Sequence, residues 1–174
     1  NNIKTFENFN KPDIFRYIIN DDIQSLKDYI NSGYDLNIQD NSGYTPLIYA
    51  AELNNIEIVK LLLNAGADIN KQDNNGNTAL MWVVINNDNN DKIFKILLNV
   101  GANLDKQNND GDTALILAAV EDNRKMVELL LDYHADEFIL DNNGKSFYYY
   151  LDDEEQQYFI KEYLLNPITE ADVN

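Results

Sequence analysis

Short apolar stretches occur in pairs along this chain, and polar turns separate them. Within residues 40–72, the first stretch (47–51) puts a leucine and two alanines on one helical face. The small alanines leave room for a second helix to come close. An Asn-Asn pair at 54–55 interrupts the pattern, and the second stretch (56–63) is apolar over too wide an arc for a solvent-exposed helix. The pattern predicts two helices that pack against each other and against neighbouring units.

Turn-forming and capping residues mark the borders of these helices. Residues 40–43 read Asp-Asn-Ser-Gly, which combines side chains that bond nearby backbone with a glycine free to adopt a positive φ. Thr45 can cap a helix start, and Pro46 is tolerated in a first helical turn. Gly66 follows the second apolar stretch and supplies a left-handed stop. The stretch therefore predicts a turn, a helix, a second turn and a second helix.

The same arrangement returns with a fixed period. Two sets of landmarks share intervals of 33, 35 and 33 residues: Gly43, Gly76, Gly111 and Gly144, and Gly33, Gly66, Gly101 and His134. A two-residue insertion in the polar loop from Ile85 to Asp91 accounts for the longer interval. A period of this length is typical of a solenoid built from helix pairs.

The period divides the chain into five units. We expect an N-terminal extension (1–11), an N-terminal capping unit (12–39), three central units (40–72, 73–107 and 108–140), and a C-terminal capping unit with a tail (141–174). Five helix pairs are predicted, with first helices that begin near Asp13, Thr45, Thr78, Thr113 and Ser146. The last unit is predicted to close with a helix from about Tyr158 to Leu164. Its tyrosines suit a terminal cap, and an aromatic ligand box is the alternative.

These units resemble the ankyrin repeat. The resemblance rests on GYTPLIYAAELNNIEIVKLLLNAGADIN at 43–70, GNTALMWVV and IFKILLNVGANLD within 76–105, and GDTALILAAVEDNRKMVELLLDYHAD at 111–136. It implies an all-α ankyrin-repeat solenoid of about five repeats, including terminal caps. It also implies β-hairpin-like finger loops between the helix pairs.

One feature of that family is missing. Its units usually carry Thr-Pro-Leu-His, and the His helps to tie adjacent units together by hydrogen bonds. Here the His positions hold Ile48, Met81, Ile116 and Tyr149. We therefore expect weaker hydrogen bonding between units, with apolar packing carrying more of their coupling.

The chain is strongly acidic. Thirteen basic and 30 acidic residues give a formal net charge of −17. Such a surface repels phosphate backbones, so we expect no nucleic-acid partner. No apolar run approaches the roughly 18 residues of a membrane-spanning helix, so we expect no membrane insertion. The charge favours a basic partner, and the alternative is that it serves solubility alone.

No group of residues predicts catalysis, a cofactor or a metal. The chain has no cysteine and a single histidine, His134, for which a surface or structural role is expected. The turns at 73–77 and 108–112 resemble the start of a calcium loop but lack its required glycine and final glutamate. The acidic run at 152–155 suits a helix start better than acid–base chemistry. We expect a non-enzymatic protein; the alternatives are a metal-binding or enzymatic module that uses the Asp/Asn finger turns, or a structural module of a larger protein.

The resemblance implies a partner-binding site on the fingertips and on the exposed face of each first helix. By register, the fingertip positions are Asn41, Ser42, Tyr44, Asn74, Asn75, Asn77, Asn109, Asp110 and Asp112, and the helix positions are Glu52, Leu53, Ile85, Asn86, Val120 and Glu121. Tyr49 and Trp82 are expected to reach the same groove, with a place in the core between repeats as the alternative. Aromatic anchors inside a polar rim are typical of a binding hot spot.

The expected partner is another protein, most simply a basic one. We expect the chain to act as a monomer in the cytoplasm. Residue 1 is Asn rather than Met, so a removed leader is also compatible with the sequence.

Overall fold

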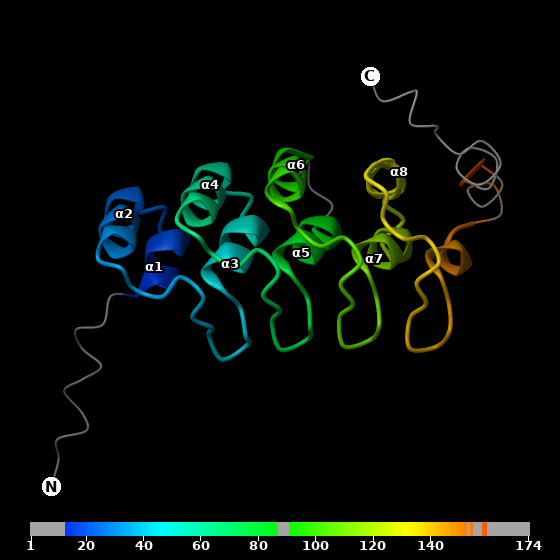
Figure 1. Ribbon diagram of the computed structural model, residues 1–174, viewed down its shortest axis with the longest axis horizontal. Helices are drawn as coiled ribbons and strands as arrows, with labels where there is room; N and C mark the ends of the chain where they lie inside the picture. Colours follow the sequence, from blue (N-terminus) through cyan, green and yellow to red (C-terminus); the bar gives the residue numbers. More distant parts are fainter. Residues whose placement is uncertain (1–12, 87–90, 153, 155–157, 160–174) are drawn as a thin grey trace, which may run out of the picture.

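The computed structural model describes residues 13–86, 91–152, 154 and 158–159. In that part of the chain, four helix pairs stand in a row and a short 3-10 helix follows them (Figure 1). The elements are α1 (Ile14–Ile19), α2 (Ile23–Asn31), α3 (Pro46–Glu52), α4 (Ile56–Asn64), α5 (Ala79–Ile85), α6 (Asp91–Val100), α7 (Ala114–Val120), α8 (Arg124–Asp132) and η1 (Phe147–Tyr150). None of the described segments is a strand, and the predicted all-α solenoid is confirmed.

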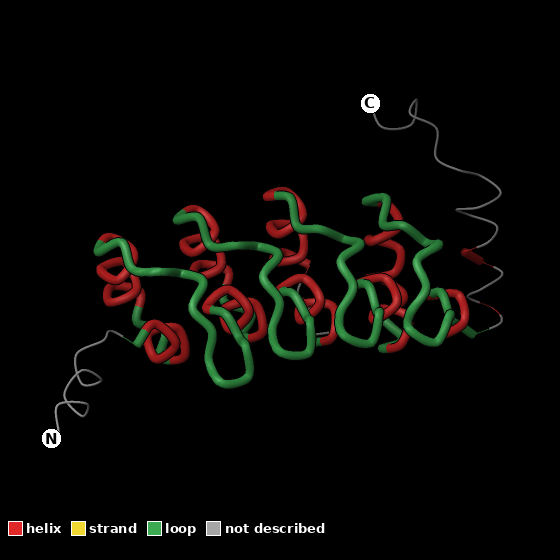
Figure 2. Tube along the Cα trace, turned by 60° about the horizontal axis from the view of Figure 1, so that its bottom comes forward, coloured by secondary structure: helices red, strands yellow, loops and turns green. Residues whose placement is uncertain are grey.

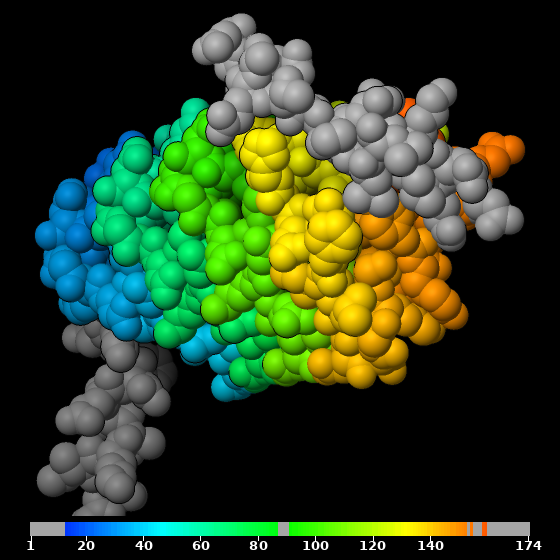
Figure 3. Space-filling model, turned by 45° about the vertical axis from the view of Figure 1, so that its right-hand side comes forward, coloured from blue at the N-terminus to red at the C-terminus, as the bar shows by residue number. Residues whose placement is uncertain are grey.

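The helices form two layers. The first helices of the pairs (α1, α3, α5 and α7) lie in one layer, and the second helices (α2, α4, α6 and α8) lie in the other (Figure 1). The loops between pairs project as fingers beyond the first layer, and they lie side by side (Figure 2). In the space-filling view the units follow one another as consecutive bands of colour (Figure 3).

Side-chain caps begin the first helices where the sequence predicts them. Asp13, Thr45, Thr78 and Thr113 each accept a hydrogen bond from the backbone N–H three residues further on, at 3.1–3.3 Å. Each cap satisfies one of the backbone donors that a helix start leaves without an intrahelical partner. Asp or Asn side chains cap α2, α4 and α8 in the same way. These four predicted starts are confirmed.

The fifth helix begins where it is predicted, after Ser146, but it is not an α-helix. The side chain of Ser146 makes no capping hydrogen bond, and Phe147–Tyr150 forms a single 3-10 turn instead of an α-helix. Aromatic residues, which lose side-chain freedom in an α-helix, occupy all four positions of this turn, whereas the first three positions of α3, α5 and α7 carry no aromatic residue. Phe147 is buried, with its ring centroid 6.3 Å from that of Phe159. The short turn lets this pair of rings close the core.

Several predicted segments lie outside the described residues. They are the N-terminal extension (1–11), most of the insertion loop (87–90), the C-terminal tail, and the predicted closing helix apart from residues 158–159.

The core lies between the two helix layers and runs through all the described units. The small pairs Ala50-Ala51 and Ala118-Ala119 are at most 3% exposed, as their close helix contacts require. Ile48, Met81 and Ile116, which stand at the family's His positions, are at most 1% exposed. Apolar side chains therefore occupy positions where the family usually places a polar one.

Glutamine side chains nevertheless connect each unit to the next by hydrogen bonds. Gln72 Nε2 donates to the carbonyl of Gly76 in the finger that follows it and to the carbonyl of Gln107, one repeat further along, the latter at 2.9 Å. Gln39 and Gln107 make the equivalent pairs of bonds. The glutamines before each finger thus supply hydrogen bonds between units that the sequence pattern did not indicate, and a larger share of apolar packing in the coupling stays a prediction.

Asparagine side chains connect the fingertips. Asn74 Nδ2 donates to the carbonyl of Asn41 at 2.9 Å, Asn109 donates to that of Asn74 at 2.8 Å, and Asn142 to that of Asn109 at 2.9 Å. The backbone N–H groups of the three donor residues also donate to the preceding finger. The fingers therefore form one continuous stack (Figure 2).

A candidate protein-binding surface

The fingers and the first helices together form one face of the molecule. Hydrogen bonds hold them in place: the Tyr49 hydroxyl of α3 donates to Asp40 Oδ2 at 2.8 Å, and Trp82 Nε1 of α5 donates to Asp73 Oδ2 at 2.9 Å. Both aspartates lie at the base of a finger. We call this face the inner surface, and we call the layer of α2, α4, α6 and α8 the outer layer.

Four rings from three consecutive units form a row on the inner surface. This aromatic row consists of Phe15, Tyr49, Tyr44 and Trp82, with successive ring centroids 5.3, 5.2 and 5.2 Å apart. The ring planes of successive pairs are inclined at 55–64°, a tilted geometry of the kind that aromatic pairs prefer over face-to-face stacking. Each ring packs against the core, yet part of it stays exposed. Both interpretations of Tyr49 and Trp82, core and surface, therefore hold in part.

Carboxylates lie along the aromatic row. Glu52, at the end of α3, is half-buried, and desolvation raises the pKa of its carboxyl group. Burial, together with the negative charges of Glu52 and Asp73, raises the pKa of Tyr44 to about 12. Hydrogen bonding to Asp40 raises the pKa of Tyr49 as well. The row is therefore an apolar strip in a negative field.

Asp112 extends the negative field to the fourth unit. Burial raises the pKa of its carboxyl group, and the charges of Asp141 and Asp110 raise it further. The ion pairs within the described part of the chain lie on α6 and α8, where Arg124 pairs with Glu128, and Lys125 with Asp91. No described basic side chain pairs with the carboxylates of the inner surface.

The fifth unit repeats the ring–carboxylate contact and adds a cation. The Tyr150 hydroxyl donates to Asp141 Oδ2. Lys145 Nζ lies 3.6 Å from the ring centroid of Tyr149 and 5.8 Å from that of Tyr150. The hydrogen bond from Tyr150, together with those from Lys145 and Asn143, lowers the pKa of Asp141 to about 2. This end of the inner surface therefore carries its own positive charge.

The structure places the predicted fingertip residues in different environments. Asn41, Ser42, Asn75 and Asp110 are exposed. Asn77 is only 8% exposed, and its Oδ1 accepts a hydrogen bond from Asn108 at 3.1 Å. Asn74 and Asn109 are exposed, but their side chains are engaged in the finger stack. Tyr44 and Asp112 are half-buried.

The predicted helix residues also differ in how exposed they are. Leu53 and Val120 are 50% and 49% exposed, and Glu121 is exposed. Ile85 and Asn86 are half-buried, and Asn86 Nδ2 donates to the carbonyl of Glu52 at 3.4 Å. Among the predicted positions, the structure brings the rings of Tyr44, Tyr49 and Trp82 into contact with one another. Val120 and Glu121 belong to the next unit along.

Sequence reasoning missed Phe15 and the aspartates that hold the rings. A signal for the aspartates exists in the repeat register. Asp40, Asp73 and Asp141 are each followed nine residues later by a ring that can donate a hydrogen bond, namely Tyr49, Trp82 and Tyr150. In the fourth unit both members change together, to Asn108 and Leu117.

The described residues offer no metal centre and no membrane span. They contain no group of three or more His, Cys, Asp or Glu side chains placed to hold a metal ion. Among them, no helix is both long and apolar enough to cross a bilayer. His134 is exposed and adopts a φ of 63°, in agreement with its predicted structural role at a helix stop.

Comparison with known proteins agrees with the geometry. A family model described as ankyrin repeats (3 copies) matches residues 14–108 and 84–174. No curated protein matches the chain significantly.

Proposed function

The chain belongs to the ankyrin-repeat family, whose repeats generally mediate protein–protein interaction, and on this basis we propose that it is a non-enzymatic scaffold that binds a basic protein on its inner surface. One observation carries the proposal. The aromatic row is partly exposed, and none of the carboxylates beside it is paired with a described basic side chain. A partner's cations would supply the missing positive charge.

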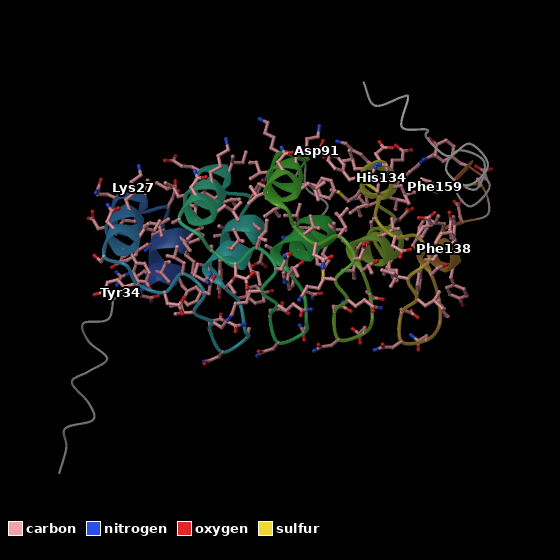
Figure 4. The ribbon with its side chains drawn as sticks, viewed as in Figure 1. Lys27, Tyr34, Asp91, His134, Phe138 and Phe159 are labelled. Atoms are coloured by element: carbon pink, nitrogen blue, oxygen red, sulfur yellow. The ribbon has the colours of Figure 1, made fainter. Side chains whose placement is uncertain are left out.

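The distribution of charge supports the inner surface over the outer layer. Lys27 and Asp91, for example, both lie on the outer layer (Figure 4). Its helices carry both signs in similar number: Lys27, Asp28, Glu57, Lys60, Asp91, Lys92, Lys95, Arg124, Lys125, Glu128 and Asp132. The excess negative charge of the chain therefore lies elsewhere, including the inner surface. A charge of this kind steers a basic partner to the site and accelerates association at low salt.

Aromatic side chains supply the affinity that charge alone does not. Rim charges contribute mainly to association rate and specificity, whereas large part-buried aromatic residues are the usual anchors of protein interfaces. Tyr44, Tyr49 and Trp82 form such a group, with Glu52 beside them. The proposed surface thus combines anchors with a negative rim.

A peptide-display selection against the immobilised chain tests this function. We expect the selected peptides to be enriched in Arg and Lys, and to lose binding at least about 10-fold to Glu52→Lys, because this change reverses the charge beside the row. Glu57→Lys is the matched control, since it makes the same change on exposed Glu57 of α4. Selected peptides without basic residues, or peptides that lose binding only to Glu57→Lys, would contradict the proposal.

A further inference from the structure

Lys145 places a cation beside two aromatic rings of the fifth unit. Its Nζ lies over the Tyr149 ring, 3.6 Å from the centroid, and within 5.8 Å of the Tyr150 centroid. The Tyr150 hydroxyl in turn donates to Asp141. A ring face attracts a cation through its quadrupole, and a hydroxyl that donates to a carboxylate makes its ring richer in electrons. The fifth unit therefore contains a ring–carboxylate pair with a cation of the chain nearby.

The same ring–carboxylate pair occurs in the second and third units. Tyr49 donates to Asp40 at 2.8 Å and Trp82 donates to Asp73 at 2.9 Å, with the nine-residue spacing of the fifth unit. The residue that corresponds to Lys145 is neutral in both, Tyr44 in one and Asn77 in the other. The cation–π contacts made by described residues involve only Tyr149, Tyr150 and Tyr158. Thus no described cation of the chain covers the rings of the second and third units.

We infer that Tyr49 and Trp82 are two cation seats, each of which takes an arginine side chain from an extended segment of the partner. Tyr150, their equivalent in the repeat register, has the Nζ of Lys145 5.8 Å from its ring centroid, whereas Tyr149, which lies closer to that Nζ, corresponds to the buried Ile48 and Met81. The inference rests on the proposed binding of a basic partner to the inner surface. Arginine suits these seats better than lysine because its planar guanidinium stacks on a ring and is less strongly hydrated. It can also reach a carboxylate such as Glu52 with two parallel hydrogen bonds.

The spacing of the seats sets the spacing of the arginines. Tyr44 lies between Tyr49 and Trp82, with its ring centroid 5.2 Å from each of theirs. The two seats are therefore no more than about 10 Å apart. An extended segment advances about 3.3 Å per residue, and alternate side chains share one face. Two arginines separated by one residue fit this geometry.

The fourth unit has no seat, because Asn108 and Leu117 replace the aspartate and the ring. Leu117 is 8% exposed, so the chain itself shows that leucine packs well at this position. Tyr49→Leu therefore removes a seat while keeping an apolar side chain that this position accepts; because it also removes the hydrogen bond to Asp40, its melting curve is measured alongside.

Fluorescence of Trp82 tests the inference, because Trp82 is the only tryptophan of the chain. The probe is an end-capped Gly/Ser peptide with two arginines separated by one residue, titrated to about 1 mM. We expect a saturable change in emission, and a loss of affinity of roughly 10-fold when either arginine is replaced by the uncharged isostere citrulline. Tyr49→Leu should weaken binding by a similar factor. Tyr133→Leu, on exposed Tyr133 at the end of α8, is the matched control and should leave binding unchanged.

The possible outcomes separate this inference from the proposed function. If the peptide binds, and both Glu52→Lys and citrulline weaken binding but Tyr49→Leu has no effect, the seats are wrong and the basic partner stands. If lysine replaces arginine without loss, the preference for guanidinium is wrong. If neither the arginine peptide nor any display-selected basic peptide changes Trp82 emission, both proposals fail. Melting curves of each variant show whether the fold is intact.

Discussion

Single side chains with fixed places in the repeat determine how neighbouring units are coupled. Each of Gln39, Gln72 and Gln107 donates through one nitrogen to two carbonyl groups, one in the finger that follows it and one about a repeat further along the chain. A partly buried carbonyl that loses its donor costs free energy unless water replaces the bond. These glutamines therefore do at the base of the fingers what a histidine usually does in this family.

Gln72→Ala tests this role. The substitution leaves the carbonyls of Gly76 and Gln107 without this donor, so we expect a loss of about 1–2 kcal/mol in the free energy of unfolding. Urea denaturation followed by circular dichroism measures it. Lys60→Ala, at an exposed position of α4, is the control and should change stability by less than about 0.5 kcal/mol. Equal stability of the two variants would contradict the role.

At the scale of elements, the backbones of neighbouring fingers come very close to each other. Gly76 has a φ of +81°, and a Cβ added to it would lie 2.7 Å from the backbone nitrogen of Asn109 in the next finger. Gly43 and Gly111 are equally crowded by the finger that follows each of them. Gly144 has the same place in the finger of the fifth unit, with a φ of +75°, but a Cβ there would meet no atom within 4 Å. Glycine is therefore needed for its φ in every finger and for space in the inner ones.

Gly76→Ala and Gly144→Ala separate these two requirements. The strain of an alanine at positive φ should cost each variant about 1–2 kcal/mol in the free energy of unfolding. Gly76→Ala should lose clearly more than this in total, since its methyl group also pushes against the backbone of the next finger. Thermal or denaturant unfolding of the two variants measures the difference. A loss for Gly144→Ala as large as that for Gly76→Ala would contradict the close stacking of the fingers.

The sequence predicts the elements where local chemistry decides them. Thr45, Thr78 and Thr113 cap their helices as expected, because a hydroxyl before an apolar stretch has one obvious partner in the first turn. Ser146 has the same pattern, yet the aromatic packing of Phe147 against Phe159 replaces the α-helix by a 3-10 turn. Tertiary packing, which the local pattern does not contain, decides this element.

At the scale of the whole molecule, the period of the sequence determines the solenoid, whereas only part of the inner surface could be predicted from it. The register indicates Tyr44 and Trp82 as surface aromatics, but it does not show that they form one row with Tyr49. It also places Asn77 at a fingertip, where the structure buries it under a hydrogen bond from Asn108. Contacts between units depend on how the fingers and helices are placed in three dimensions, which the spacing of residues along the sequence does not give.

The two faces of the molecule therefore differ in their charges. The outer layer carries charges of both signs, and it contains both ion pairs found among the described residues. The inner surface carries an aromatic row beside carboxylates that no described basic side chain pairs with, and we propose that it binds the partner.

An isotope-edited NMR titration with the two-arginine peptide tests this central claim most directly, because it locates the bound peptide residue by residue. We expect the largest shifts at the backbone amides of Tyr44, Tyr49 and Glu52 and at the indole N–H of Trp82, whose hydrogen bond to Asp73 gives it a distinct environment. The amides around Lys60 and Lys95 on the outer layer should stay unchanged. Shifts concentrated on α4 and α6, with the Trp82 indole unaffected, would contradict binding on the inner surface.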